Sequence, residues 1–294
     1  MSDSMRVFTD SVAMQQWSDD RRMAGRRVVV VPTMGALHAG HVALIDEART
    51  HGDDVVVTIF VNPLQFNSST DFDHYPRPID DDLVACAEAG VHAVYAPTAA
   101  AMYPAGFQTH VQPGALAELL EGQHRPGHFR GVTTVVTKLF GATRPHVAVF
   151  GQKDAQQLAI VRQMVADLDL GVQIVAMPTV REHDGLAMSS RNRRLTPADR
   201  AAAVCIWQGL EALGTAVGRG ERNIDVLTAI AIGPIAEQPR ATLEYLQLVD
   251  PQTLQPLTGA LADTSTDSDS SGRLLVVVAA WFGEVRLIDN LLLN

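Results

Sequence analysis

The sequence predicts an α/β protein whose first part is an open, doubly wound parallel sheet and whose second part is a smaller α+β domain. Between residues 27 and 180, short runs of β-branched residues alternate with longer stretches of helical periodicity. The chain has 294 residues, which is long enough for two cores. Its composition, 47% hydrophobic and 19% charged, is that of a globular protein.

Five apolar runs are predicted to form the strands of the sheet. Strands buried on both faces read as nearly continuous apolar runs, because helices cover both sides of a parallel sheet. The predicted strands span residues 28–31, 54–61, 92–96, 146–151 and 172–177. The predicted connecting helices, which have apolar residues at helical spacing, span residues 42–50, 80–89, 131–140 and 155–168.

The character of the chain changes after the segment "MPTVREHDGLAMSSRNRRLTPADR", so we predict domains of residues 1–183 and 184–294. Thr196 and Pro197 are a capping residue and a first-turn proline, and they predict a helix over 197–217. Three further runs, 241–249, 273–282 and 284–290, are strand-like. The acidic, serine-rich segment 263–272 is predicted to be a loop between two of these strands.

Charge and composition exclude several classes of partner. The net charge of −10, from 33 acidic and 23 basic residues, argues against broad nucleic-acid binding. We find no apolar run long enough for a membrane span and no signal-peptide pattern, so we expect no membrane role and a cytoplasmic location. The two cysteines, Cys86 and Cys205, have no partner motif and are predicted to be buried free thiols.

The segment "TMGALHAGH" after the first predicted strand is the strongest candidate for a site. In open parallel sheets, ligands lie at the carboxyl ends of the strands. Gly35 and Gly40 let the backbone approach a ligand, and a helix starting near His41 offers N–H groups to a phosphate. His38 and His41 can donate to the same anion. The alternative is that one histidine caps the helix and the other packs; a zinc site has less support, and the GxGxxG pattern of dinucleotide sites is absent.

Two other strand ends carry polar side chains. Asn62 and Gln65 in "FVNPLQFN" offer neutral amides for hydroxyls or a carboxylate, although Asn-Pro alone is typical of a turn. Lys153, one of only two lysines, stands beside Asp154 in "GQKD" at a helix start; a solvated ion pair is the alternative. These segments are expected to converge on one edge of the sheet.

Two further segments have weaker signals. Residues 189–191 in "MSSRN" suit the outer phosphates of a triphosphate, with an arginine that can bind two oxygens; an ordinary loop is the alternative. The three aspartates at 80–82 stand at a predicted helix start. One of them can bind the Mg²⁺ that accompanies a triphosphate, and compensation of the helix dipole is the alternative.

Taken in order, the motifs "PTMGALHAGH", "IFVNPLQF", "RPGHFRGV", "FGQKDAQQL" and "LAMSSRN" resemble those of the HxGH nucleotidylyltransferases and, within them, of the pantothenate synthetase (pantoate–β-alanine ligase) family. The resemblance covers residues 27–195 most closely. HxGH alone is shared by many nucleotide-transferring enzymes, whereas "FVNPLQF" and "RPGHFRGV" together are far more specific.

The resemblance implies a Rossmann-like domain with a smaller C-terminal lid in a homodimer. It implies a two-step reaction of coenzyme A biosynthesis, in which the carboxylate of (R)-pantoate attacks the α-phosphorus of ATP and β-alanine then displaces AMP from pantoyl adenylate. The products are pantothenate, AMP and pyrophosphate, and the expected cofactor is Mg²⁺.

The resemblance also implies roles for individual residues. His41 is the expected proton donor, with His38 assisting and Lys153 on the phosphates. The ATP-binding set is Met34, Gly35, Ala36, Leu37, His38, Ala39, Gly40, His41, Gly151, Gln152, Lys153, Asp154, Val180, Met188, Ser189, Ser190 and Arg191. Pantoate is expected at Gln65, Gln157 and Asn62, β-alanine at Gln65, and Mg²⁺ at Asp81. The alternatives are another HxGH nucleotidylyltransferase and a catalytically inactive nucleotide-binding module.

Overall fold

The computed structural model describes residues 4–261 and 274–293 and divides into two compact units. The first unit comprises residues up to 152 together with 156–178, and the second comprises 153–155 together with 179 onward. The second unit thus begins slightly before the predicted boundary at 183/184. The segment 263–272, predicted as a loop, lies outside the described residues.

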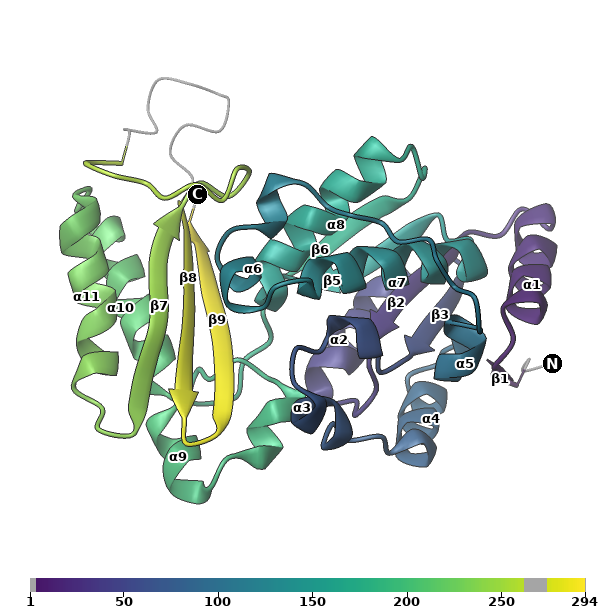
Figure 1. The fold of residues 1–294 in the computed structure, drawn as a ribbon, viewed down its shortest axis with the longest axis horizontal. Helices are drawn as coiled ribbons and strands as arrows, with labels where there is room; N and C mark the ends of the chain where they lie inside the picture. The colour runs from purple at the N-terminus through teal and green to yellow at the C-terminus, as the bar shows by residue number, and fades with distance from the viewer. Residues whose placement is uncertain (1–3, 262–273, 294) are drawn as a thin grey trace. The chain divides into compact units, whose positions relative to one another are not determined.

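The first unit contains a six-stranded, all-parallel sheet in the order β1-β4-β3-β2-β5-β6 (Figure 1). The strands are β1 (Arg6–Phe8), β2 (Val28–Thr33), β3 (Asp54–Ile59), β4 (Ala93–Tyr95), β5 (Val147–Gly151) and β6 (Gln173–Met177). Five of them confirm the predicted strands within a few residues, and the edge strand β1 was not predicted. From β2 the chain moves outward to β3 and β4, and it later returns to β5 on the other side of β2.

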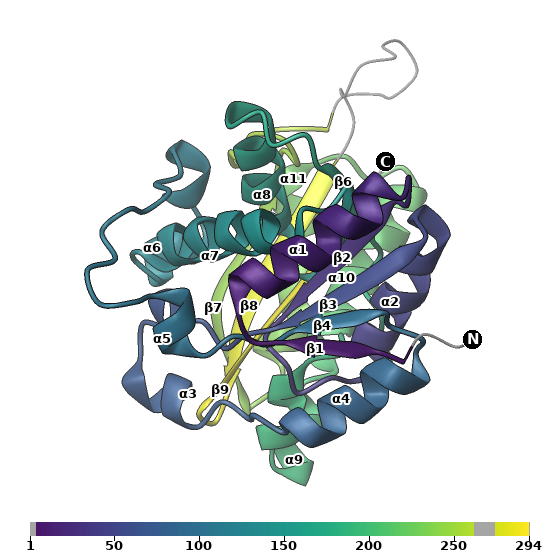
Figure 2. The same cartoon turned by 90° about the vertical axis from the view of Figure 1, so that its right-hand side faces the viewer.

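Helices cover both faces of this sheet, as Figure 2 shows. They are α1 (Ser11–Met23), α2 (Ala39–His51), α3 (Ser69–Asp73), α4 (Ile79–Glu88), α5 (Ala99–Met102), α6 (Glu121–His124), α7 (His128–Thr143) and α8 (Ala155–Asp167). α1, α7 and α8 pack on the face that carries Val28 and Val30, and α2 and α4 pack on the face that carries Val29 and Val31. The doubly wound α/β prediction is therefore confirmed.

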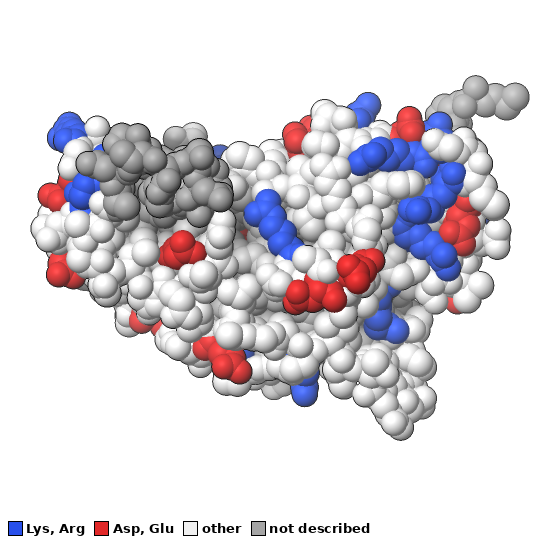
Figure 3. Space-filling view, turned by 90° about the horizontal axis from the view of Figure 1, so that it is seen from above, with Lys and Arg blue, Asp and Glu red and all other residues white. Residues whose placement is uncertain are grey.

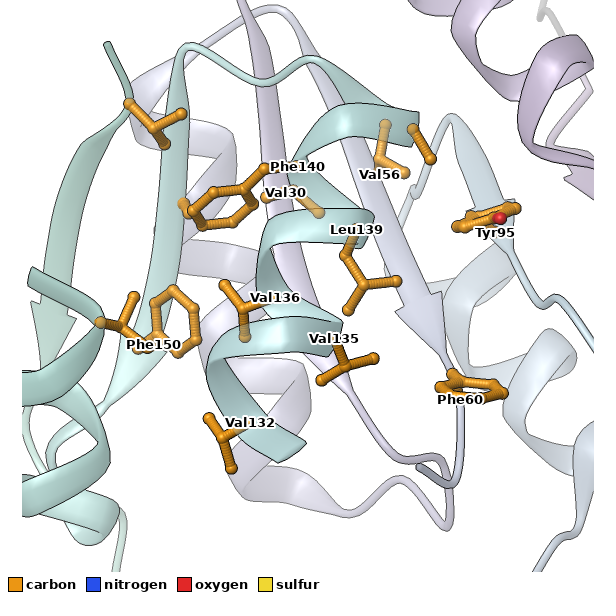
Figure 4. Packing of buried hydrophobic residues seen from close by; sticks show 14 of the residues in the cluster. Val30, Val56, Phe60, Tyr95, Val132, Val135, Val136, Leu139, Phe140 and Phe150 are labelled. Atoms are coloured by element: carbon orange, nitrogen blue, oxygen red, sulfur yellow. The ribbon is translucent and has the colours of Figure 1, made fainter. Parts of the chain in front are cut away.

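Helix α7 is the main cover of one face. Its apolar side chains recur at helical spacing, and Figure 4 shows them packed against the sheet: Val132, Val135, Val136, Leu139 and Phe140 on α7, with Val30, Val56 and Phe150 on the strands. Each fully buried side chain of this size contributes about 1.5–3 kcal/mol to folding. This packing fixes α7 over the strand ends that carry the candidate site.

The second unit has a three-stranded antiparallel sheet, β7 (Ala241–Val249), β8 (Leu274–Phe282) and β9 (Val285–Leu293). Its helices are α9 (Pro197–Ala202), α10 (Cys205–Gly218) and α11 (Ile224–Ala236). α10 and α11 lie against the sheet face that carries Val276 and Val278 (Figure 1). The α+β prediction for this part is confirmed, while the helix predicted over 197–217 is two helices.

By length and composition alone, residues 197–218 could cross a membrane. No segment of this kind was predicted from the sequence. These criteria are weak evidence because core helices also meet them. Here the segment is broken between Ala202 and Cys205, and its buried residues Ile206, Leu210 and Leu213 belong to the core of the second unit. Both cysteines are buried free thiols, as predicted.

Two histidines lie at the amino ends of the strands, away from the candidate site. His146 Nδ1 accepts a hydrogen bond from Val28 N at 3.0 Å, and His92 Nδ1 accepts one from Val55 N at 3.0 Å. Burial lowers the pKa of both imidazoles. The folded state therefore favours the neutral rings, which alone can accept these hydrogen bonds.

This geometry predicts acid sensitivity of the fold. Because the pKa of His146 is lower in the folded than in the unfolded chain, the unfolded chain binds more protons. The contribution of His146 is present above a pH of about 6.5 and is lost as pH falls below it. A His146→Asn variant keeps an acceptor for Val28 N without titrating. When the pH is lowered from about 7.5 to 5.5, the free energy of unfolding in urea is expected to fall less for the variant than for the wild type. Equal losses of unfolding free energy would contradict this.

Candidate active site

The turn after β2 is held in a shape that most residues avoid. Gly35 has φ +79° and Ala36 has φ +52°, and a Cβ on Gly35 would lie 2.8 Å from Asp82 Oδ2. The buried Asp82 carboxylate accepts hydrogen bonds from Ala36 N at 2.8 Å and Leu37 N at 2.7 Å. Asp82 on α4 therefore fixes the backbone of the loop that leads into α2.

His38 and His41 cap the first turn of α2 reciprocally. His38 Nδ1 accepts from Gly40 N at 3.1 Å, and His41 Nδ1 accepts from His38 N at 3.4 Å. Their ring centroids are 4.1 Å apart. Because each Nδ1 is an acceptor, each neutral ring carries its proton on Nε2. Capping thus accounts for one nitrogen of each ring and leaves each Nε2 in the donor state that an anionic ligand requires.

Gln65 lies in the short turn 63–65 that follows β3. The residue is 9% exposed, and its Nε2 donates to Met34 Sδ at 3.1 Å. Its carbonyl oxygen accepts from His128 Nδ1 at 2.7 Å and from Arg125 Nη2 at 3.1 Å. The structure therefore brings Met34 and Gln65 together, from the ends of two neighbouring strands.

Asn62 is fully engaged within the protein. Its Nδ2 donates to Gln65 Oε1 at 3.0 Å and to Gly131 O at 3.1 Å. Its Oδ1 accepts from Leu64 N at 3.2 Å and from Tyr103 Oη at 2.7 Å. A carboxamide has two donor and two acceptor positions, so none is left for a ligand. These contacts disfavour direct binding of pantoate by Asn62, which stays a prediction, and they position Gln65.

The adjacent glutamines Gln156 and Gln157 have different roles. The buried Gln156 side chain donates to Leu116 O at 2.8 Å and Leu119 O at 2.7 Å, and it accepts from Glu121 N. It holds the connection before α7. Gln157 is half-buried in the first turn of α8, after β5. β2, β3 and β5 are neighbours in the sheet, so the segments that carry His41, Gln65 and Gln157 follow adjacent strand ends.

In the second unit, Lys153 is held through its backbone. Asn290 on β9 donates from Nδ2 to Lys153 O at 2.7 Å. The neighbouring Asp289 is 3% exposed, and burial raises the pKa of its carboxyl group. Its two carboxylate oxygens accept hydrogen bonds from Arg181 Nη1 at 2.6 Å and Nη2 at 3.1 Å. The Arg181 guanidinium carbon in turn lies 3.9 Å from the centre of the Trp207 ring. β9 thus anchors both the Lys153 backbone and Arg181, the residue that follows Val180.

Residues 180–191 form a hairpin and a short 3₁₀ turn. Met188 N donates to Val180 O at 2.9 Å, so the hairpin brings these two predicted nucleotide contacts together. Ser189 Oγ accepts from Arg191 N at 3.3 Å and caps the turn over Ser190–Arg194. Asn192 ties this turn to the hairpin by donating to Glu182 Oε1 and Ala187 O. "MSSRN" is therefore an ordered segment of the second unit.

A family model described as Pantoate-beta-alanine ligase matches residues 6–292. The chain belongs to the pantoate–β-alanine ligase family. Among curated relatives, the pantothenate synthetase of Chloroherpeton thalassium is 47% identical, with 97% of this chain and 98% of that protein covered. The one from Geobacter sulfurreducens is 46% identical, with 99% of each covered.

Solved structures of pantoate–β-alanine ligases have the same fold. The pantothenate synthetase from Thermus thermophilus superposes with a TM-score of 0.89 at 41% identity, covering 98% of this chain and 99% of that one. The ligase from Francisella tularensis, complexed with beta-gamma ATP and beta-alanine, has a TM-score of 0.75 at 33% identity, covering 98% and 97%. The family prediction made from the motifs is confirmed.

Several supporting residues of this pantoate–β-alanine ligase family member were missed in the sequence. Asp82, Tyr103, Gln156 and Asn290 act on residues that are distant in sequence. Of these four, only Asp82 has a signal in the sequence, as one of three consecutive aspartates, and the predicted Mg²⁺ ligand is its neighbour Asp81. Asp81 is exposed, whereas Asp82 points inward. Among the residues that the structure describes, no group of three or more His, Cys, Asp or Glu side chains is placed to hold a metal ion.

Removal of the two neighbouring aspartates of α4 is expected to lower stability by very different amounts. An Asp82→Ala variant leaves two buried N–H groups without their acceptor, and we expect a loss of about 2–5 kcal/mol in the free energy of unfolding. Asp81→Ala removes an exposed carboxylate near a helix start and is expected to cost less than about 1 kcal/mol. Urea unfolding of both variants measures this difference; similar losses would contradict the assigned role of Asp82.

Proposed function

We propose that this chain joins pantoate to β-alanine with ATP, by way of pantoyl adenylate. The observation that carries the proposal is the HxGH segment at the start of α2, in a chain that belongs to this ligase family along nearly its whole length. The segment follows β2, the strand that has β3 on one side and β5 on the other. The strand order reverses at this point, and ligands of doubly wound sheets usually bind there.

In the first step, a carboxylate oxygen of pantoate attacks the α-phosphorus, and the bond from that phosphorus to the bridging oxygen of pyrophosphate breaks. Negative charge gathers on the α-phosphate and on the departing pyrophosphate. The Nε2–H groups of His38 and His41, together with the amino end of α2, supply donors for this charge. The Lys153 ammonium and the Arg191 guanidinium supply positive charge for the outer phosphates.

In the second step, the amine of β-alanine attacks the acyl carbon of the adenylate. The acyl–oxygen bond breaks, AMP leaves with that oxygen, and the nitrogen loses a proton as the amide forms. Gln65 and Gln157 are proposed to bind pantoate in both steps, with Gln65 also near β-alanine. The buried Gln65 amide supports this role, because its Nε2 meets a thioether, a weak acceptor, within the protein.

The remaining nucleotide contacts are proposed as they were predicted. They are Met34–His41, Gly151–Asp154, Val180 and Met188–Arg191. Mg²⁺ is proposed to enter with ATP, where it would neutralise phosphate charge. Mg²⁺ usually takes one or two protein carboxylates beside the phosphates, and the exposed Asp81 fits a single ligand of this kind. Both oxygens of Asp82 accept backbone hydrogen bonds, which disfavours it for this role.

The homodimer and the cytoplasmic location stay predictions, as does the absence of nucleic-acid partners. On the face that Figure 3 shows, basic side chains lie in small groups, several with acidic side chains beside them, and much of the surface is uncharged. This distribution agrees with the net charge of −10 and supports small-molecule substrates over a polyanion.

Isotope exchange between pyrophosphate and ATP tests the proposed function. Exchange that requires pantoate but not β-alanine supports the ligase. Exchange driven by a mononucleotide instead would support another HxGH nucleotidylyltransferase. If no AMP forms with ATP, pantoate and β-alanine together, the chain is an inactive nucleotide-binding module and the proposal is wrong.

A further inference from the structure

The orientation of the Asn62 amide is fixed by two backbone groups. Leu64 N can only donate, and it donates to Asn62 Oδ1 at 3.2 Å. Gly131 O can only accept, and it accepts from Asn62 Nδ2 at 3.1 Å. Side-chain amides are often ambiguous because oxygen and nitrogen look alike, but a backbone donor and a backbone acceptor on opposite ends leave one arrangement. Asn62 is 1% exposed, so solvent does not compete for these positions.

The orientation of Asn62 determines that of Gln65. The second N–H of Asn62 Nδ2 points to Gln65 at 3.0 Å, so the Gln65 atom that faces it is the acceptor Oε1. The NH₂ group of Gln65 is then on the other side, 3.1 Å from Met34 Sδ. Gln65 therefore offers hydrogen-bond donors, and a ligand atom that it binds must be an acceptor, such as a carboxylate or hydroxyl oxygen.

Tyr103 completes the chain of hydrogen bonds. It lies after α5 and donates from Oη to Asn62 Oδ1 at 2.7 Å. The rings of Phe60 and Phe107 lie 6.0 and 5.0 Å from its ring and hold it in place. Burial raises the pKa of the Tyr103 hydroxyl, so it keeps its proton at neutral pH and remains a donor.

We infer that Tyr103 is a positioning residue which, through Asn62, holds the Gln65 amide with its N–H groups toward an acceptor oxygen of pantoate. The inference rests on the proposed function, because it assigns the donor side of Gln65 to that substrate. Without the Tyr103 hydroxyl, Asn62 Oδ1 loses its shortest hydrogen bond, and Asn62 and Gln65 gain freedom to rotate their amides.

A Tyr103→Phe variant removes the hydroxyl and keeps the ring. We expect its KM for pantoate to rise by about 5–10-fold while its KM for ATP changes by less than about twofold, since the loss is that of one buried hydrogen bond. Tyr95→Phe is the matched control: Tyr95 is also buried in the first unit, and its hydroxyl bonds with Ser11. A purely structural role for Tyr103 would instead lower thermal stability and raise the two KM values alike.

The outcomes separate the inference from the proposed function. Wild-type chain without pantoate-dependent exchange would overturn both. Active wild type with equal pantoate KM values in Tyr103→Phe and Tyr95→Phe would overturn the inference alone. A second measurement needs no variant: on addition of pantoate to ¹⁵N-labelled wild type, the Gln65 side-chain N–H resonances are expected to shift, and unchanged resonances at saturating pantoate would also overturn it.

Discussion

A His41→Asn variant is expected to unfold at the wild-type urea concentration and yet to lose about 10²–10³-fold in pantoate-dependent exchange of pyrophosphate into ATP. The asparagine Oδ1 stands where Nδ1 of the imidazole does, so it can still accept from His38 N. Asparagine has no atom at the position of Nε2, so the donor proposed for the α-phosphate is lost. Exchange and urea unfolding are measured on the same preparation.

A His41→Gln variant is the control for this interpretation. Its side-chain amide nitrogen reaches the position of Nε2, but the variant has no acceptor for His38 N. Loss of this cap is expected to cost about 0.5–2 kcal/mol of stability. The glutamine variant should therefore be less stable and more active than the asparagine variant. If the asparagine variant is the more active one, His41 acts only by capping the start of α2, and the assignment of a catalytic role to His41 is wrong.

Lys153→Ala is expected to reduce the same exchange by about 10²–10³-fold, because it removes a positive charge proposed to lie on the phosphates. The turn itself should persist, since Asn290 binds the backbone carbonyl of Lys153 and does not depend on the side chain. The exchange rate is measured at saturating pantoate, where the loss is expected to appear. The free energy of unfolding in urea should stay close to that of the wild type.

The other lysine of the chain is the matched control. Lys138 lies on α7, with Nζ 5.3 Å from the centre of the Phe107 ring, and has no proposed contact with ATP. Lys138→Ala should retain exchange within about threefold of the wild type, as expected for a side chain with one cation–π contact. Near-normal exchange in Lys153→Ala would refute its assignment to the phosphates.

The sheet was predictable where its strands are buried on both faces. The runs at 28–31 and 54–61 become β2 and β3, whose residues are almost all buried. β1 was missed because three residues, two of them exposed, leave no apolar run at a sheet edge. α1 was not predicted either, although Asp10 caps it and Met14 and Trp17 are buried. In that helix, a narrow buried face is surrounded by polar residues.

The candidate site was predictable where its residues follow strands. His38, His41 and Gln65 lie where their sequence positions indicated. The rotation of α4 about its axis turns Asp82 inward and leaves Asp81 exposed. Sequence periodicity does not show which of two adjacent residues faces inward. The partner of Asn62 is Tyr103, 41 positions away, and such a pairing is set by tertiary packing alone.

The carboxylate of Asp82 belongs to the connection between β3 and β4, whereas the loop that it shapes precedes β3. During synthesis, residues 34–37 therefore emerge before the helix that gives them their form. Once the chain is folded, the amide hydrogens of Ala36 and Leu37 should exchange with deuterium only when α4 detaches. Their exchange rates would report the undocking of a helix that itself contributes no residue to the HxGH segment.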